Sequence, residues 1–369
     1  MGYEIDFLAV GDGERGGDAI ALRFGNLHGT RQEQFVMIID GGSKESGQKL
    51  VEFVQTFYET SDVDLVVSSH PDNDHVSGLT VVLENLEVGR LWMHRPWEHA
   101  ADFRDLFKNK TLTTIGLERS LRKALDSAYE LEQLADEMGV PIDEPFSDIG
   151  LPFSNLGIYV LGPSTSYYEQ LLPGFRETPE AKAEAKPSLL SASLTYAKEA
   201  ALKWLDEKWG IETLTDPDEN ATSAENNSSV ILLVVVGEKS LLFTGDAGVP
   251  ALADAVATAT SAGFTWPSLS FMQAPHHGSK HNLGPTILNT LLGPKLTEPL
   301  SDRTVFVSAP VKGDPKHPSR RVTNALQRRG AHGRVYVTAG QNKWHRDNAP
   351  VRSTYIDAVP VEFHTRVEE

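Results

Sequence analysis

The sequence predicts an α/β fold in which a polar site lies where buried strands end. Short apolar runs, typical of buried strands, alternate along the chain with segments whose apolar residues recur every three or four positions, as in amphipathic helices. One such run, Leu65–Val67, leads directly into the sequence SSHPDNDH. This stretch offers four side chains of the kinds that bind divalent metals, namely His70, Asp72, Asp74 and His75. We therefore expect sheets covered by helices, with a metal site at one sheet edge.

The first half of the chain reads as strands and helices in alternation. A glycine-rich stretch joins the first two strands into a hairpin with a long loop, and the third strand ends in Asp40-Gly41-Gly42. Residues 97–140 are charged and helical in period, which indicates a helical insertion packed on the sheets. We expect strands at 3–10, 19–24, 35–39, 65–67, 88–93 and 156–161, and helices at 48–60 and 78–86, the second with its N-terminus toward the metal motif.

Residues 171–225 read as an acidic, partly flexible insertion. A polar stretch rich in Pro, Ala and Glu, typical of a linker, precedes a helix expected at 190–209 and an acidic tail. About 55 residues with one helix make too little core for a separate domain, so we expect 1–369 to form a single domain. A regulatory protein or a protease acting on this insertion would be a means of gating a cationic cleft; a decorative surface insertion is the alternative.

The second half supplies further polar residues after apolar runs. An expected hairpin ends in Gly245-Asp246, the next strand leads into Pro275-His276-His277-Gly278-Ser279, and Lys316-His317-Pro318 opens a helix. We expect strands at 227–236, 240–244, 268–273, 305–308, 335–338 and 353–363, and a helix at 319–328.

Composition narrows the function classes. The chain has no cysteine, which excludes disulfides, thiolate metal sites and cysteine nucleophiles and fits a cytoplasmic location. We expect no signal peptide, because the N-terminus has no basic region followed by a long apolar stretch, and no membrane span, because no run of about 18 apolar residues occurs. The net charge of −17 makes the general surface a poor binder of nucleic acid, so such binding would need a local basic patch.

The motif His-x-Asp-x-Asp-His at 70–75 resembles the His-x-His-x-Asp-His signature of the metallo-β-lactamase fold, with Asp72 in place of the second histidine. This variant resembles the branch that contains the C-terminal hydrolase domain of ComEC-type competence proteins and the phosphorylcholine esterases. The sequences IDGG at 39–42, TGD at 244–246 and PHHGS at 275–279 are similar to further motifs of the family. The resemblance implies a four-layer αββα sandwich with helical insertions.

Two imidazoles and two carboxylates exceed what one tetrahedral ion needs, so the motif suggests two ions close together. A polar turn with incidental histidines is the alternative. The resemblance implies that Asp246 bridges the ions. The expected ligands are His70 and Asp72 on one ion and Asp74, His75 and a later histidine on the other, with the choice among His276, His277 and His317 left open. Zn²⁺ is the expected metal, and Mn²⁺ also suits so oxygen-rich a site.

Other residues are expected to support this chemistry. Asp74, His75 and His276 are the expected catalytic residues, while Asp40 and Asn227 are expected to orient ligands from behind. For Asp40, the alternative is a turn that only ends a strand.

The expected activity is that of a phosphodiesterase or nuclease, DNA being the favoured substrate, working through a metal-bridging hydroxide. Residues 303–352 carry eleven Lys or Arg against two acids, a basic segment beside the later motifs. Lys280, Arg320 and Arg321 are the expected substrate-binding residues; ordinary solvated helix faces are the alternative. A small-molecule hydrolase of phosphorylcholine-type or other esters is the second function, and a non-catalytic metal-binding regulator the third.

Overall fold

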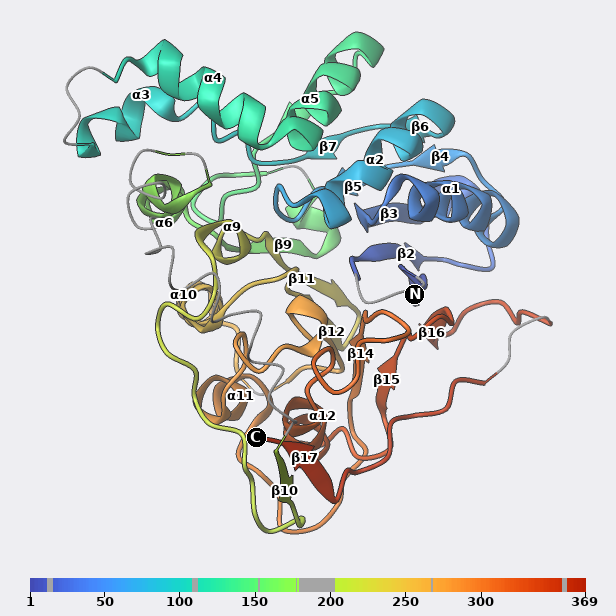
Figure 1. Ribbon diagram of the computed structural model, residues 1–369. Helices are drawn as coiled ribbons and strands as arrows, with labels where there is room; N and C mark the ends of the chain where they lie inside the picture. Colours follow the sequence, from blue (N-terminus) through green and yellow to red (C-terminus); the bar gives the residue numbers. More distant parts are fainter. Residues whose placement is uncertain are drawn as a thin grey trace.

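Two β-sheets pack face to face, and helices cover both outer faces (Figure 1). The computed structural model describes residues 1–11, 16–107, 112–151, 153–176, 178, 203–266, 268–353 and 357–369. The four layers confirm the sandwich that the sequence predicts.

The first sheet combines an antiparallel hairpin with a parallel half. β1, β2 and β3 pair antiparallel, and the parallel strands continue from β3. The strand order is β16 (Lys343–Asp347), β1 (Gly2–Phe7), β2 (Ala19–Gly25), β3 (Gln34–Gly41), β5 (Leu65–Val67), β7 (Leu91–Trp92) and β8 (Ile142–Asp143).

The second sheet is parallel from β12 to β15 and antiparallel at the β9 end. Its order is β15 (Val335–Val337), β14 (Thr304–Val307), β13 (Phe271–Gln273), β12 (Lys239–Phe243), β11 (Ile231–Val236) and β9 (Ile158–Gly162). Two small ribbons pair β4 (Asp62–Val63) with β6 (Glu87–Val88), and β10 (Trp204–Asp206) with β17 (Arg366–Glu368).

The helices divide between the two outer faces. Those packed on the first sheet come from the first half of the chain: α1 (Lys44–Phe53, continued as a π-helix to Tyr58), α2 (Asn73–Asn85), α3 (Ala100–Phe103), α4 (Thr114–Ala124) and α5 (Asp126–Met138). Those on the second sheet are α10 (Val249–Ser261), α11 (Pro285–Leu292) and α12 (Arg320–Gln327). Two short helices, α6 (Thr165–Leu171) and α9 (Ala224–Asn227), pack against each other.

Three apolar cores correspond to the three interfaces between layers. In β3, Ile38 points to the helices of the first face, whereas Met37 and Ile39 point into the core between the sheets. This alternation follows from the two-residue period of a strand. Phe243 and Phe271 of the second sheet fill the other side of the central core. Both sheets are thus buried on both faces, which fixes the strand ends rigidly.

α2 begins earlier than the sequence suggests. It starts at Asn73 rather than at 78, so Asp74 and His75 of the metal motif lie in its first turn and Asp72 is its N-cap residue. A Cβ on Gly78 would lie 1.9 Å from the Gly41 carbonyl oxygen, and the Gly78 N–H donates to Gly42 O at 2.8 Å. Only glycine permits this approach, which places α2 against the end of β3.

Two predicted elements are wrong within the described residues. The helix expected at 190–209 lies outside them up to residue 202, and its remainder contains β10, because residues 204–206 pair with the C-terminal strand β17. The strand expected at 353–363 is absent from residues 353 and 357–363, although Val361 donates a backbone hydrogen bond to Val335. The second sheet, which this strand was expected to close, ends at β15, and β16 pairs with β1 at the edge of the first sheet.

Among the described residues, no helix has the length and apolar character needed to cross a bilayer.

Candidate metal centre

The metal motif occupies the connection between a buried strand and a helix. β5 ends at Val67, and the chain passes through Ser69 and His70 before α2 begins. Asp72 is the N-cap residue of α2, but its carboxylate makes no capping hydrogen bond. Instead Asp72 Oδ2 faces His70, at 3.7 Å from the Nε2 atom. The strand and the helix therefore present an imidazole and a carboxylate to the same point.

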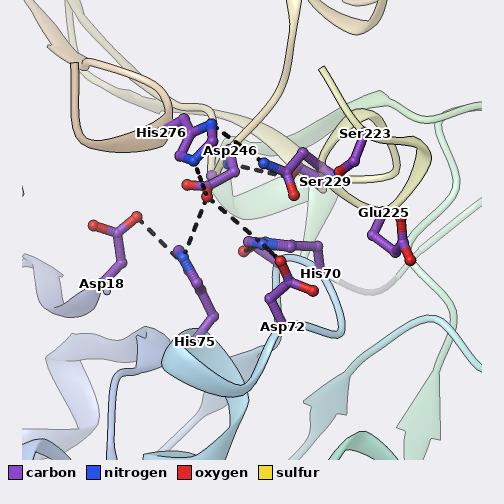
Figure 2. A network of polar contacts seen from close by, with 12 residues as sticks. Asp18, His70, Asp72, His75, Ser223, Glu225, Ser229, Asp246 and His276 are labelled. Carbon is purple, nitrogen blue, oxygen red and sulfur yellow. Dashed lines mark hydrogen bonds and ion pairs between the residues drawn. The ribbon is translucent and has the colours of Figure 1, made fainter. Parts of the chain in front are cut away.

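Asp246 lies at the centre of the cluster and follows the end of β12 (Figure 2). Its Oδ2 is 3.6 Å from His75 Nε2 and 3.8 Å from the Nε2 atoms of both His70 and His276. Two atoms bound to one tetrahedral ion by bonds of about 2.1 Å lie about 3.4 Å apart. The spacing is therefore that of ligands around a shared ion and too long for direct hydrogen bonds.

Four histidines are oriented alike. Each donates a hydrogen bond through Nδ1, and such an imidazole presents the lone pair of Nε2 to a metal. The bonds run from His70 to Ser69 Oγ (2.9 Å), from His75 to Asp40 Oδ2 (2.8 Å), from His276 to Asn282 Oδ1 (2.9 Å) and from His277 to the Ser308 carbonyl oxygen (2.9 Å).

Several polar atoms at the centre are buried without a hydrogen-bond partner among the described residues. They are His70 Nε2, His75 Nε2, Asp18 Oδ1 and Asp246 Oδ1. Leaving such atoms unpaired costs about 1–3 kcal/mol each. A bound cation would satisfy the Nε2 atoms of His70 and His75, which lie 3.8 and 3.6 Å from the same Asp246 oxygen, and nitrogen and carboxylate donors together suit Zn²⁺ or Mn²⁺. The residues present thus fit divalent metal.

Asp18, which precedes β2, joins the cluster without having been predicted. It is buried, its Oδ2 accepts a hydrogen bond from Gln273 Nε2 at 2.7 Å, and it lies 3.8 Å from His75 Nδ1. One ligand atom each of Asp18, His75 and Asp246 lies within 4.8 Å of the others. The available signal was a Gly-Gly-Asp sequence directly before a buried strand.

A second group of ligand atoms, also within 4.8 Å of one another, comes from Asp74, His75 and His277. His317 lies further out: its ring stacks on His276 with centroids 5.7 Å apart and lies 6.1 Å from His277. It belongs to none of the candidate ligand groups found among the described residues. Of the three later histidines, His277 belongs to such a group, and His276 Nε2 lies 3.8 Å from Asp246 Oδ2. His317 lies beside both, and its predicted role as a ligand stays a prediction.

Backbone strain is concentrated at this site. Asp40, His276 and His277 have positive φ angles of 55°, 47° and 55°. Residues other than glycine rarely adopt this conformation, and surrounding structure must hold them in it. At these three positions the strain aims ligands or their supports at the centre.

The charges of the cluster reinforce one another. Burial alone would raise the pKa of Asp246, but His276 and His75 outweigh it and hold the pKa well below its usual range. Burial alone would lower the pKa of His75, but the carboxylates of Asp246 and Asp40 raise it well above the ordinary value. Burial raises the pKa of Asp18 to about 6, with His75 opposing the rise. A divalent cation would replace the protons that this arrangement attracts.

The predicted substrate-binding residues lie near the C-terminal strand and are already engaged. Lys280 Nζ donates to a Glu369 oxygen at 2.9 Å, and Arg321 Nε donates to the Glu368 carbonyl at 2.6 Å. Arg320 donates to the Asp314 carboxylate through Nε and Nη2.

Asn227, predicted to support a ligand, fastens the turn after β12. Its Oδ1 accepts from the Gly248 N–H at 3.2 Å, and its Nδ2 donates to the carbonyls of Thr222 and Ser223. The neighbouring Asn226 side chain lies 3.3 Å from His276 Nδ1. α9 thus braces two parts of the cluster.

Arg176 and Glu225 were not predicted to take part, yet they border the centre. Arg176 Nη2 donates to Asp72 Oδ1, while its backbone N–H and Nε both donate to Glu225 Oε1, at 2.7 and 2.9 Å. Nothing in the local sequence relates Arg176 to Glu225, because 49 residues separate them.

Solved structures with similar arrangements share little sequence with this chain. A putative metallo-beta-lactamase from Thermotoga maritima is 10% identical with a TM-score of 0.32, covering 67% of this chain and 79% of its own. A diphosphatase of the PhnP family is 9% identical with a TM-score of 0.35, covering 94% and 98%. A metallo-beta-lactamase from Erythrobacter litoralis is 12% identical with a TM-score of 0.27, covering 69% and 76%. No curated protein matches the sequence.

A family profile identifies the chain where these similarities do not. The profile of the metallo-beta-lactamase superfamily matches residues 30–283, more than half of the sequence. The match includes His70, Asp72, His75 and Asp246, around which the ligand atoms converge. The chain belongs to the metallo-beta-lactamase superfamily.

Proposed function

We propose that this superfamily hydrolase is a metal-dependent phosphodiesterase with two ion positions that share Asp246. The observation that carries the proposal is the orientation of four histidines, each held through Nδ1 with Nε2 left for metal. Divalent ions held there would lower the pKa of a bound water and offset the negative charge that develops on a phosphoryl group.

The residues divide between two positions. In this proposal His70, Asp72 and His276 would hold one ion together with Asp246, and Asp74, His75, His277 and Asp18 would hold the other with it; the distances and ligand groups of the cluster support this division. Asp40 keeps His75 in the tautomer that binds metal, and it also accepts a hydrogen bond from Ser69 Oγ, the partner of His70.

For the substrate we propose a phosphodiester, with nucleic acid, DNA above all, as the polymeric form. The basic segment 303–352 gives a polymer less support than its composition suggests, because five of its arginines are paired with carboxylates. These are Arg303, Arg320, Arg328, Arg329 and Arg352. A small phosphoester is therefore as well supported as nucleic acid as the substrate.

Side-by-side hydrolysis assays test the proposal. Zn²⁺- or Mn²⁺-loaded protein would be incubated with bis-p-nitrophenyl phosphate, plasmid DNA, RNA and a phosphorylcholine ester. We expect the chromogenic diester to be hydrolysed, and a chelator to abolish that activity. Stoichiometrically loaded protein that hydrolyses none of the four would contradict the proposal and favour a metal-binding regulator.

Reversal of Arg320 and Arg321 to Glu separates polymer from small substrate. Loss of DNA cleavage with full cleavage of the small diester would support a polymer track. Equal losses on both substrates would show that these arginines serve the fold, as their contacts with Asp314 and Glu368 suggest.

A further inference from the structure

Arg176 stands where the chain leaves the metal centre for the insertion, and its position is fixed from both sides. The preceding Phe175 is fully buried, with its ring 6.1 Å from that of Tyr168. Thr178 is also fully buried, and its hydroxyl donates to the Pro173 carbonyl oxygen. Arg176 itself is held by Glu225, a residue of α9 that is 5% exposed.

The guanidinium is only partly used by these contacts. Nε donates to Glu225 and Nη2 to Asp72, whereas Nη1 has no hydrogen-bond partner among the described residues. The side chain remains 42% exposed. Arginine is suited to phosphate because its planar fork can donate two parallel hydrogen bonds to anionic oxygens.

Asp72 connects this cation to the metal position. Its Oδ2 faces His70 across 3.7 Å, and its Oδ1 accepts the hydrogen bond from Arg176. One carboxylate therefore faces a metal ligand with one oxygen and a guanidinium with the other. Figure 2 shows Asp72 and Glu225 on the side of the cluster away from Asp18.

We propose that Arg176 is a substrate-binding residue that holds an anionic oxygen of the substrate beside the metal position of His70 and Asp72. Glu225 positions it, and Nη1 is the donor offered to the substrate. The inference rests on the proposed function for the identity of the substrate as a phosphoester, but the anion site itself does not depend on hydrolysis.

The position of Arg176 changes the role expected for the N-terminal end of the insertion 171–225. Residues 171–225 were expected to be partly flexible, yet at their start Leu172–Gly174 form a 3-10 helix and Leu172 is fully buried. The gating hypothesis placed acidic residues in a cationic cleft, whereas the residue of this segment that reaches the motif is a cation.

Binding of inorganic phosphate to metal-loaded protein, measured by calorimetry, tests the inference without any need for turnover. Arg176→Gln should weaken phosphate binding about 10- to 100-fold at unchanged metal content, the loss expected for one charge-assisted hydrogen bond to an anion. Arg176→Lys should retain part of the affinity, and Glu225→Gln should give an intermediate loss. Arg122→Gln, which removes an arginine paired with Glu98, is the control and should change nothing.

If the protein hydrolyses the diester, steady-state kinetics provides a second test of the role of Arg176. Arg176→Gln should raise KM for bis-p-nitrophenyl phosphate more than it lowers kcat, because the lost contact is made in the ground state as well. Wild-type phosphate affinity in metal-loaded Arg176→Gln protein would overturn the inference and leave the proposed function intact. Arg176-dependent phosphate binding without hydrolysis would do the reverse.

Discussion

Asp40 Oδ2 accepts a hydrogen bond from His75 Nδ1 at 2.8 Å, and the same oxygen accepts one from Ser69 Oγ at 2.6 Å. Ser69 Oγ, which donates its proton to Asp40, accepts a hydrogen bond from His70 Nδ1. The buried Asp40 carboxylate therefore sets the tautomer of both His75 and His70. Its other oxygen accepts the Ser69 backbone N–H at 2.7 Å. Asp40 thus organises the motif from behind while touching no substrate position.

Asp40→Asn should weaken metal binding about 10- to 100-fold, the usual range for groups that orient metal ligands. An amide can still accept one hydrogen bond, but it lacks the charge that favours His75 with its proton on Nδ1. Competition of the metal-loaded protein against a chromophoric chelator measures the affinity. Asp136→Asn, on the exposed face of α5, is the matched control; equal affinities in both variants would remove Asp40 from the centre.

His75→Ala and Asp74→Ala should lose bound metal and hydrolysis together while the fold survives. The reason is that the three apolar cores lie away from these side chains. Elemental analysis of dialysed protein gives the metal content, and circular dichroism checks the fold. A variant that keeps full stoichiometric metal would show that its residue is not a ligand.

Arg328→Met should destabilise the protein by about 3–5 kcal/mol, because it leaves Glu207 as an unpaired buried charge. Both side chains of this ion pair are 0% exposed. The double variant with Glu207→Leu should recover much of the loss, as happens when a buried pair is replaced by apolar residues. Urea unfolding measures both free energies.

The control for that pair lies on the same helix. Arg320 and Asp314 form a pair with side chains 26% and 52% exposed, and Asp314→Asn should cost at most about 1 kcal/mol. A cost for Arg328→Met as small as that for Asp314→Asn would contradict the expectation that burial makes the Arg328–Glu207 pair costly to break.

Stability should fall as the pH drops from 7 to 4.5, in part because of His345. Burial lowers the pKa of this histidine to about 4, below its value in the unfolded chain. Between these two pKa values the unfolded state binds a proton at His345 and the folded state does not. The stability that is present above pH 6.5 is therefore lost as the pH falls. For one such group the loss is about 2 kcal/mol over this range.

His345→Gln, which does not titrate but still offers a hydrogen-bonding group to the Tyr3 hydroxyl, should reduce that dependence. Urea unfolding at both pH values gives the comparison. An unchanged difference between the two pH values would mean that His345 becomes protonated without unfolding.

Much of the fold could be predicted from the sequence because strands and helices each give the apolar residues a characteristic spacing. The strand expected at 65–67 is found at those residues, and the alternation of Ile38 and Ile39 between two cores follows from the strand period. By contrast, residues 204–206 became a strand because the C-terminal strand β17 pairs with them, a partner about 160 residues away that no local pattern can reveal.

The sequence by itself indicated the family of the chain and the residue types of the candidate site, because His70, Asp72, Asp74 and His75 lie within six consecutive residues and form a local motif. Only the tertiary structure decided which distant residues join them. Asp18, His276 and Arg176 approach the cluster from separate strand ends and loops, and the ring of His317 stacks on that of His276. The tertiary structure also decided the state of the basic residues. The sequence has eleven Lys or Arg in 303–352, but some of these arginines form ion pairs with carboxylates distant in sequence, such as Glu207 and Glu4. The physical reason is that packing of the sheets and helices decides which side chains meet at the site and which charges form ion pairs. The spacing of residues along the sequence does not specify that packing.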